Sequence, residues 1–305
     1  MRNLLLNLLF FPVTVEFVIG NVVNGFIVLM NCIDWVKRHK ISSVDQILTA
    51  LALSRIGLYW AMVTNWYIAR FYSSLCTSEA IITIHIAWIL SNHFSIWFAT
   101  SLSIFYLFKI ANFSNSFFLY FKRRVKGVVV AILLGSLTVL GTQLAVATLD
   151  NNVRVTEYKR NMTLKTAFED QIRLSNMAVF TLENCIPFTI SLMCFVLLIF
   201  SLMRHLRKMQ LSGRGDRDPN TQVHIRALKT VISFLLLFAC YFLALIISAW
   251  GSNRLRNKYV LLFGEIIFEL YPSGHSFILI WGNKKLKEAF LGFLWSLMCC
   301  LRGRE

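Results

Sequence analysis

The stretch TVISFLLLFACYFLALIISAW, residues 230–250, runs for 21 residues without a charged side chain. A helix needs about 20 mostly apolar residues to cross the hydrocarbon core of a membrane, so this stretch predicts a transmembrane helix. Six other stretches are similar, and in lipid each must satisfy its own backbone hydrogen bonds as a helix. The seven predicted spans are residues 12–33, 44–69, 80–108, 128–148, 176–204, 230–250 and 259–281.

The composition agrees with a membrane protein. Hydrophobic residues make up 57% of the 305 residues and charged residues only 15%, which excludes an ordinary soluble domain. We expect an all-α bundle of seven transmembrane helices, formed by a single domain over residues 1–305 with a tail at 282–305. The chain shows no internal repeat, which argues against a transporter built from duplicated halves. An odd number of crossings places the chain ends on opposite sides of the membrane, which suits a signal receptor.

The basic residues predict the orientation of the bundle. A formal net charge of +16 would suit nucleic acid, but Lys and Arg gather in cytoplasmic loops of membrane proteins. The loops after the first, third and fifth spans, together with the tail, hold about twice as many basic residues as the opposite side. We therefore expect the N-terminus outside, the C-terminus in the cytoplasm, and no nucleic-acid partner.

Modification sites fit this orientation. Asn161-Met162-Thr163 is an acceptor for N-glycosylation in the segment predicted to lie outside between spans four and five. A second acceptor triplet begins at Asn112, on the predicted cytoplasmic side, and should stay unmodified. None of the seven cysteines falls in residues 149–175, so we expect no disulfide there. Cys299 and Cys300 are either palmitoylated or a pair of free thiols.

The tail has an amphipathic pattern. From Lys284 onward the apolar residues share one helical face, which predicts a helix lying in the membrane interface with membrane lipids as its partner. A short frayed tail is the alternative. The apolar residues of this face are Leu286, Ala289, Phe290, Phe293, Leu294, Leu297 and Met298.

Polar and aromatic residues inside the spans predict a binding pocket. An ionisable group within a membrane is costly and indicates function. At about 1.5 Å of rise per residue, Glu265, Trp88 and Tyr241 lie roughly 9, 12 and 14 Å below the outer ends of their spans. Asn92 is one turn below Trp88 on the same face, and Asn65 in the second span lies somewhat higher. The other ionisable residues in spans are Glu16, Arg55, Glu183 and Glu269.

Aromatic walls with a few polar groups are typical of a small-molecule pocket, open here to the outside. The alternative is that these aromatic residues only pack the bundle. Arg55 lies too deep to reach an external ligand, and Asn24 and Ser276 fall at comparable levels. We therefore interpret Arg55 as a structural or switching node, with snorkelling toward the inner headgroups as the alternative.

Prolines and missing motifs complete the prediction. Pro12, Pro187 and Pro272 interrupt spans and favour kinks, and Pro272 is a candidate hinge. The sequence contains no P-loop, no G-x-S-x-G and no Cys/His spacing for zinc. We expect neither an enzyme nor a cofactor or metal site.

Six strings carry a resemblance to a known family. They are NGFIVLMNCIDW (24–35), LTALALSR (48–55), FYLFKIANFS (105–114), SLMRHLRKMQ (201–210), HIRALKT (224–230) and HSFILI (275–280). In this order and at these spacings they resemble the vertebrate bitter taste receptors, the type 2 taste receptor family of G-protein-coupled receptors. The resemblance covers about residues 16–287.

The resemblance implies a plasma-membrane receptor for bitter small molecules that signals through a gustducin-type heterotrimeric G protein, phospholipase C and calcium. A transporter or channel and a related pheromone receptor remain the rival interpretations. The chain lacks the acidic-Arg-Tyr, Asn-Pro-x-x-Tyr and Cys-Trp-x-Pro motifs of rhodopsin-like receptors, so their switch mechanisms do not transfer. By resemblance the ligand positions are Asn65, Trp88, Asn92, His93, Tyr241 and Glu265, and the G-protein contacts are Lys109, His205 and Lys208.

Overall fold

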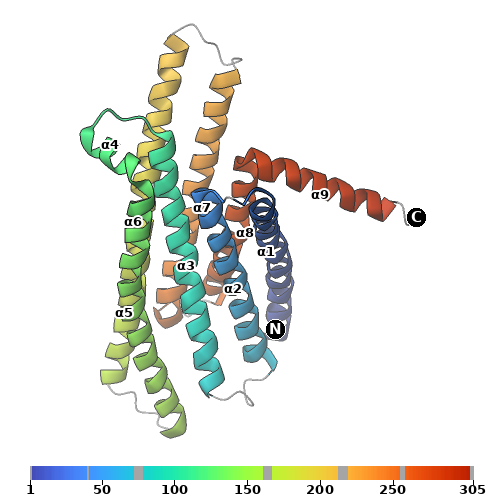
Figure 1. Ribbon diagram of the computed structural model, residues 1–305. Coiled ribbons are helices and arrows are strands. Elements are labelled where there is room, and N and C mark those ends of the chain that lie inside the picture. Colours follow the sequence, from blue (N-terminus) through green and yellow to red (C-terminus); the bar gives the residue numbers. More distant parts are fainter. Residues whose placement is uncertain are drawn as a thin grey trace.

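Nine helices account for most of the described part of the chain (Figure 1). The computed structural model describes residues 2–39, 41–71, 78–160, 167–211, 219–254 and 258–302. The helices are α1 (Arg2–Arg38), α2 (Ser43–Phe71), α3 (Ser78–Ile110), α4 (Ser116–Arg123), α5 (Val125–Arg160), α6 (Ala167–Leu211), α7 (Pro219–Arg254), α8 (Lys258–Gly282) and α9 (Lys284–Arg302).

Seven of these helices form the predicted transmembrane bundle. Within the described residues, α1, α2, α3, α5, α6 and α7 each contain a segment long and apolar enough to cross a membrane. The 25-residue helix α8 is the seventh crossing. The predicted fold class, a seven-helix membrane bundle with an additional C-terminal helix, is therefore confirmed.

Four helices, α1, α5, α6 and α7, extend well beyond the predicted spans, whereas α2, α3 and α8 end within two residues of them. For example, α5 is predicted as 128–148 and observed as Val125–Arg160, and α6 is predicted as 176–204 and observed as Ala167–Leu211. Hydropathy marks where a helix leaves the hydrocarbon, whereas a helix ends where capping or a breaker ends it. The outer segment 149–175 is consequently helical up to Arg160 and again from Ala167.

Two short helices lie at the same end of the bundle (Figure 1). Helix α4, which hydropathy did not predict, begins at an N-cap: the Asn115 side chain accepts a hydrogen bond of 2.9 Å from the Phe117 backbone N–H. Helix α9 begins after Asn283, whose Oδ1 accepts from the backbone N–H groups of Lys285 and Leu286. Asparagine is a favoured residue at both places because its side chain satisfies otherwise unpaired helix N–H groups.

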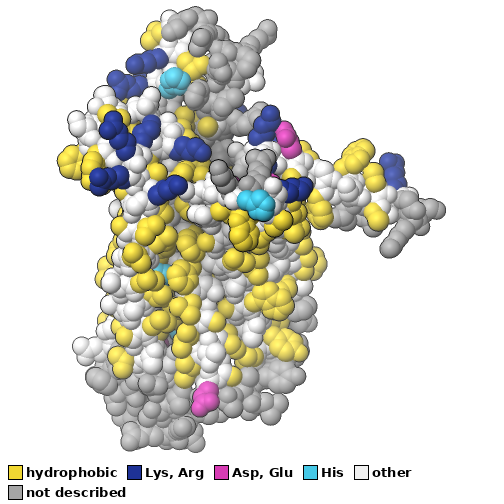
Figure 2. Space-filling model, viewed as in Figure 1, with side chains coloured by type: hydrophobic (Ala, Val, Ile, Leu, Met, Phe, Trp, Pro, Cys, Tyr) yellow, Lys and Arg dark blue, Asp and Glu magenta, His cyan; other side chains and the backbone are white. Residues whose placement is uncertain are grey.

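The distribution of charge orients the bundle. Figure 2 shows Lys and Arg side chains gathered at the end that carries α4 and α9, above sides covered by hydrophobic residues. This basic end is the cytoplasmic side, and the N-terminus lies toward the opposite, outer end (Figure 1).

The buried core is arranged around α3, which packs against α2, α5 and α6. Its larger part lies in the cytoplasmic half and includes Leu51, Leu102, Leu198 and Ile280, each at most 2% exposed. A second cluster around Tyr241 and Phe268 lies closer to the outside.

Candidate functional site

A buried hydrogen bond joins α3 and α7 in the predicted pocket region. The Tyr241 hydroxyl donates to Asn92 Oδ1 over 2.8 Å, and each side chain is only 2% exposed. Two polar groups can lie buried in a membrane bundle when they satisfy each other across a helix interface. The structure thus brings together two of the six ligand positions expected from the sequence.

Aromatic rings of α3, α6 and α8 pack in the same cluster as Tyr241. The Trp88 ring lies with its centroid 5.9 Å from Phe180 of α6 and 6.0 Å from Phe268 of α8. The Tyr241 ring stacks on Phe268 at 5.3 Å and approaches Tyr271 at 4.2 Å. Side chains of α3, α6, α7 and α8 therefore converge at one level, with apolar faces around a central polar pair.

His93 points away from this cluster. Its Nε2 lies 3.2 Å from the Ser136 hydroxyl of α5, and its ring packs against Trp97 at 5.9 Å. His93 thus belongs to the interface between α3 and α5, while its neighbour Asn92 faces α7. Its expected role as a ligand contact stays a prediction.

A small polar cavity lies beside Asn92. Its volume is about 10 Å³, enough for about one water molecule. Glu183 lines it with one oxygen hydrogen-bonded to the Thr142 hydroxyl at 3.0 Å, while its Oε2 has no partner among the described residues. Gln143 and Asn184 also line the cavity. From the sequence, Glu183 was recognisable only as an ionisable residue within a span, and its position beside Asn92 depends on how α3 and α6 pack.

The structure does not test the roles expected for three of the site residues. Asn65 lies on α2 with an exposed side chain. Glu265, like Glu269, belongs to α8, but their side chains lie outside the described part of the structure. Asn161 also lies outside the described residues. The roles expected for Asn65, Glu265 and Asn161 stay predictions.

A second polar cluster lies deeper, around Arg55 of α2. Arg55 is fully buried, and its NH1 donates to the Ser276 hydroxyl over 2.7 Å, while its NH2 contacts His275 Nδ1. The Ser276 hydroxyl donates to Asn24 Oδ1, also at 2.7 Å. These bonds connect α2, α8 and α1 at one level. A buried cation requires such hydrogen-bond partners.

Tyr271 connects the two clusters. Its ring lies 4.2 Å from the Tyr241 ring on one side, and the Arg55 guanidinium carbon lies 5.6 Å from its centroid on the other. Pro272 follows in the same helix, and its carbonyl oxygen lies 2.9 Å from the Ser276 hydroxyl. A continuous series of contacts therefore runs from Asn92 to the Arg55 cluster.

Pro187 of α6 also takes part in a contact between helices. It is buried, and its carbonyl oxygen accepts from the Thr100 hydroxyl of α3 at 3.3 Å. Thr100 in turn lies 2.9 Å from the Ser191 hydroxyl, one turn further along α6. The proline therefore lies where α3 and α6 are joined by hydroxyl groups.

The expected G-protein contacts are exposed at the basic end. Lys109 lies in the last turn of α3, with its ammonium group 5.8 Å from the Phe105 ring. His205 and Lys208 lie on α6. The backbone N–H of Asn112 donates to the Ser201 hydroxyl over 3.2 Å. This bond holds the end of α3 against α6 one turn before His205.

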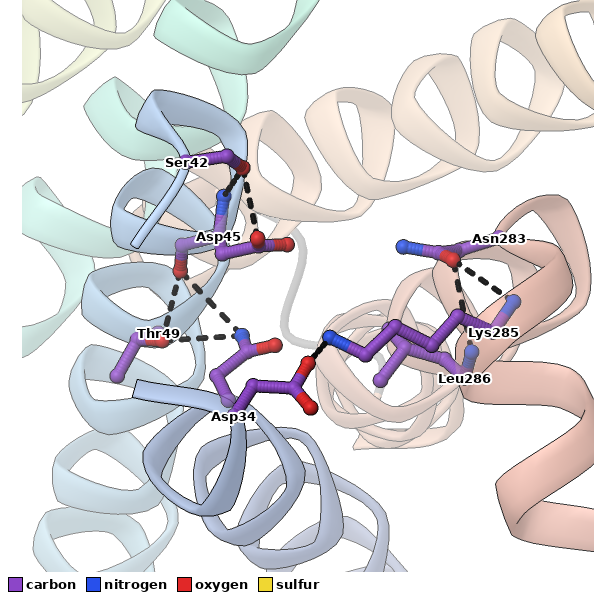
Figure 3. A network of polar contacts seen from close by, with 8 residues as sticks. Asp34, Ser42, Asp45, Thr49, Asn283, Lys285 and Leu286 are labelled. Carbon is purple, nitrogen blue, oxygen red and sulfur yellow. Dashed lines mark hydrogen bonds and ion pairs between the residues drawn. The ribbon is translucent and has the colours of Figure 1, made fainter. Parts of the chain in front are cut away.

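A polar network also fixes α9 to the bundle (Figure 3). Lys285 of α9 forms an ion pair with Asp34 of α1, and burial lowers the pKa of the Lys285 ammonium group. Asn31 of α1 donates to the Thr49 hydroxyl of α2 at 3.0 Å. Helix α9 then extends away from the bundle (Figure 1), with Cys299 and Cys300 exposed near its end.

A profile of the taste receptor protein (TAS2R) family matches residues 1–298. The chain belongs to this family. The human putative taste receptor type 2 member 33 is 54% identical over 293 residues, 96% of this chain and 95% of that protein. The human taste receptor type 2 member 46 is 53% identical over the same share of each chain. The bonobo (Pan paniscus) taste receptor type 2 member 19 is 54% identical over 297 residues, 97% of this chain and 99% of that protein.

Membership settles the class of the molecule. It is a membrane-embedded G-protein-coupled receptor of the bitter taste type, as the sequence strings predicted. The named relatives are receptors, in agreement with the expectation that the chain is not an enzyme.

Proposed function

We propose that the receptor resides in the plasma membrane, binds bitter small molecules at the aromatic cluster around Asn92 and Tyr241, and activates a gustducin-type heterotrimeric G protein, leading to phospholipase C and calcium signalling. The observation that carries the proposal is the buried Asn92–Tyr241 pair between the rings of Trp88, Phe268 and Tyr271. Membership of the taste receptor family supports the signalling steps.

The agonist stacks on Trp88 and Tyr241. A neutral agonist hydrogen-bonds with Asn92, whose Oδ1 accepts from the Tyr241 hydroxyl in the structure. Binding at that oxygen therefore replaces a bond between α3 and α7 and frees α7 to move. A basic agonist pairs with Glu265 of α8.

A ligand shifts a receptor only if it binds the active arrangement more tightly than the resting one. The contacts from Tyr241 through Tyr271 to Arg55 give a physical route by which a change at α7 reaches α2 and α1. Pro272 lies directly after Tyr271 and acts as the hinge of α8. Asn65 extends the site toward α2, and His93 contributes to it through the small cavity that it lines together with Asn92.

At the cytoplasmic end the G protein docks on Lys109, His205 and Lys208. An acidic surface on the partner is attracted to this basic end. The oligosaccharide at Asn161 lies on the opposite, outer side.

The test is a calcium assay in cells that co-express the receptor with a gustducin-type G protein, using a panel of basic and neutral bitter compounds. Glu265→Gln removes the negative charge but keeps the shape of the side chain. A charged hydrogen bond contributes about 1.5–3 kcal/mol, so the half-maximal concentration of basic agonists should rise roughly 10- to 150-fold. Neutral agonists should be unaffected.

Glu79→Gln, an exposed acid at the outer end of α3, is the matched control and should change neither class. Equal loss for basic and neutral agonists at matched surface expression would contradict charge pairing by Glu265. Silence toward the whole panel, with normal surface expression, would contradict the bitter receptor function itself.

A further inference from the structure

A groove of about 390 Å³ opens between α2, α3 and α5 in the cytoplasmic half of the bundle. It lies away from the aromatic cluster, and none of the expected ligand or G-protein contacts lines it. Its volume is within the range of sites that hold small molecules. Helix α3 lies between α2 and α5 (Figure 1) and packs against both, and the groove lies where residues of the three helices meet.

One wall is a single stripe of α2. Ser43, Gln46, Ile47 and Ala50 line the groove, and their spacing of three, four and seven residues places them on one helical face. The polar members lie at the cytoplasmic end of the stripe and the apolar members deeper. Asp45 is not among the lining residues. Its side chain accepts from the Ser42 hydroxyl (Figure 3), and its backbone carbonyl accepts from Asn31 of α1.

The opposite wall repeats the same pattern on α5. Lys126, Val129, Val130 and Leu133 line the groove with the same spacing, again with the polar residue toward the cytoplasm and the apolar residues deeper. Val130 is 54% exposed although it lies in a membrane span. Two aromatic rings of α3, Phe98 and Phe105, and Ile41, which precedes α2, complete the lining.

The charged residues at the cytoplasmic end of the groove are basic. Lys126 is exposed at the start of α5, and Arg123 and Arg124 precede it, also exposed. No acidic side chain is among the described residues that line the groove. A long apolar surface that ends in a cation at the headgroup level matches an acyl chain joined to a negatively charged headgroup, and anionic lipids are concentrated in the cytoplasmic leaflet.

We propose that this groove binds one anionic phospholipid of the cytoplasmic leaflet, with an acyl chain between the α2 and α5 stripes and the phosphate at Lys126. Lys126 reaches the headgroup by extending its aliphatic stem along the apolar wall. The bound lipid fills the space between α2 and α5 and contacts Phe105, one turn before Lys109 at the end of α3. The site is independent of the agonist pocket.

Native mass spectrometry of the full-length receptor tests the charge recognition. The receptor is equilibrated with equal amounts of phosphatidylserine and phosphatidylcholine that carry identical acyl chains. The receptor should retain one phosphatidylserine about five-fold more strongly than phosphatidylcholine, because this is the effect of one basic residue near a membrane surface. Lys126→Ala should reduce this preference to parity. Lys229→Ala, an exposed lysine on α7 outside the groove, should leave it unchanged.

A second pair of variants tests the apolar wall. Ala50→Phe fills the groove and should release one lipid of either headgroup, whereas Leu53→Phe, on an exposed α2 position outside the groove, should not. If Ala50→Phe does not purify as a monodisperse protein, Val130→Ser replaces it, with Leu134→Ser as its exposed control on α5.

Three outcomes would overturn the proposal. The first is equal retention of the two phospholipids by the unmodified receptor. The second is the same loss of preference in Lys126→Ala and Lys229→Ala, which indicates general surface charge. The third is the same lipid count in the wall variant and its control, which indicates lipids that only surround the bundle.

Discussion

The hydrogen bond between Tyr241 and Asn92 should be measurable as a coupling free energy between α7 and α3. Tyr241→Phe deletes the donor but keeps the ring contacts with Phe268 and Tyr271. Interhelical hydrogen bonds in membrane proteins contribute about 0.6 kcal/mol on average and up to about 1.7. Complete burial and a length of 2.8 Å place this bond toward the upper end.

A small cavity beside Asn92 lowers the coupling free energy that we expect. Asn92 borders the water-sized cavity that Glu183 also lines, so a water molecule can replace part of the lost bond. We therefore expect a coupling of about 1 kcal/mol. The assay is a double-mutant cycle with Tyr241→Phe, Asn92→Ala and the double variant, in which the free energy of unfolding is measured in mixed micelles.

Tyr120→Phe is the matched control, because Tyr120 is an exposed tyrosine on α4, at the cytoplasmic end. Paired with Asn92→Ala, it should give a coupling near zero. A coupling near zero for Tyr241 and Asn92 as well would refute the view that this bond holds α3 and α7 together.

Two further predictions concern packing and the buried charge. Gly20→Ala places a Cβ against the Tyr59 ring, so it should lower the free energy of unfolding by about 1–3 kcal/mol. Gly25→Ala is the control, because it has open space beside it and should change the stability little. Equal effects of the two variants in thermal unfolding would contradict the packing of α1 on α2. Arg55→Ala leaves its neutral partners Ser276 and His275 without their hydrogen bonds and should cost about 1–3 kcal/mol. This should be seen as lost surface expression and an equal rightward shift for all agonists in the calcium assay. A change in agonist preference alone would show that Arg55 contacts the ligand.

Hydropathy was sufficient to predict the bundle but not the ends of four of its helices, α1, α5, α6 and α7. The requirement for apolar residues in lipid fixes where each span must lie. Nothing in that requirement stops α5 near residue 148, and the helix continues to Arg160. Helix α4 was missed because its eight residues are too few to give a hydropathy signal, although Asn115 is a recognisable N-cap.

The sequence predicted how deep in the membrane the site residues lie, but not in which direction around each helix their side chains point. Counting residues along each helix placed Trp88, Asn92 and Tyr241 at similar levels, and the structure brings Asn92 and Tyr241 into contact. Depth does not show which way a side chain faces. His93 is about 100° around the helix from Asn92, and it faces Ser136 of α5 instead.

The contributions of Phe268 and Tyr271 could not be read from the sequence either. They are ordinary aromatic residues in an apolar helix, and only their contacts with Tyr241 and Trp88 distinguish them. Such contacts depend on how α7 and α8 pack, which neither the hydropathy nor the spacing of one helix specifies.

The Asn92–Tyr241 pair also bears on how selective the receptor can be. Sites that leave a donor or acceptor waiting for its substrate strongly reject molecules lacking the complementary group, because that group then remains buried and unpaired. Here the Tyr241 hydroxyl and Asn92 Oδ1 satisfy each other. A guest without hydrogen-bonding groups that preserves this bond leaves neither atom unpaired, so we expect the proposed site to discriminate among such guests chiefly by shape.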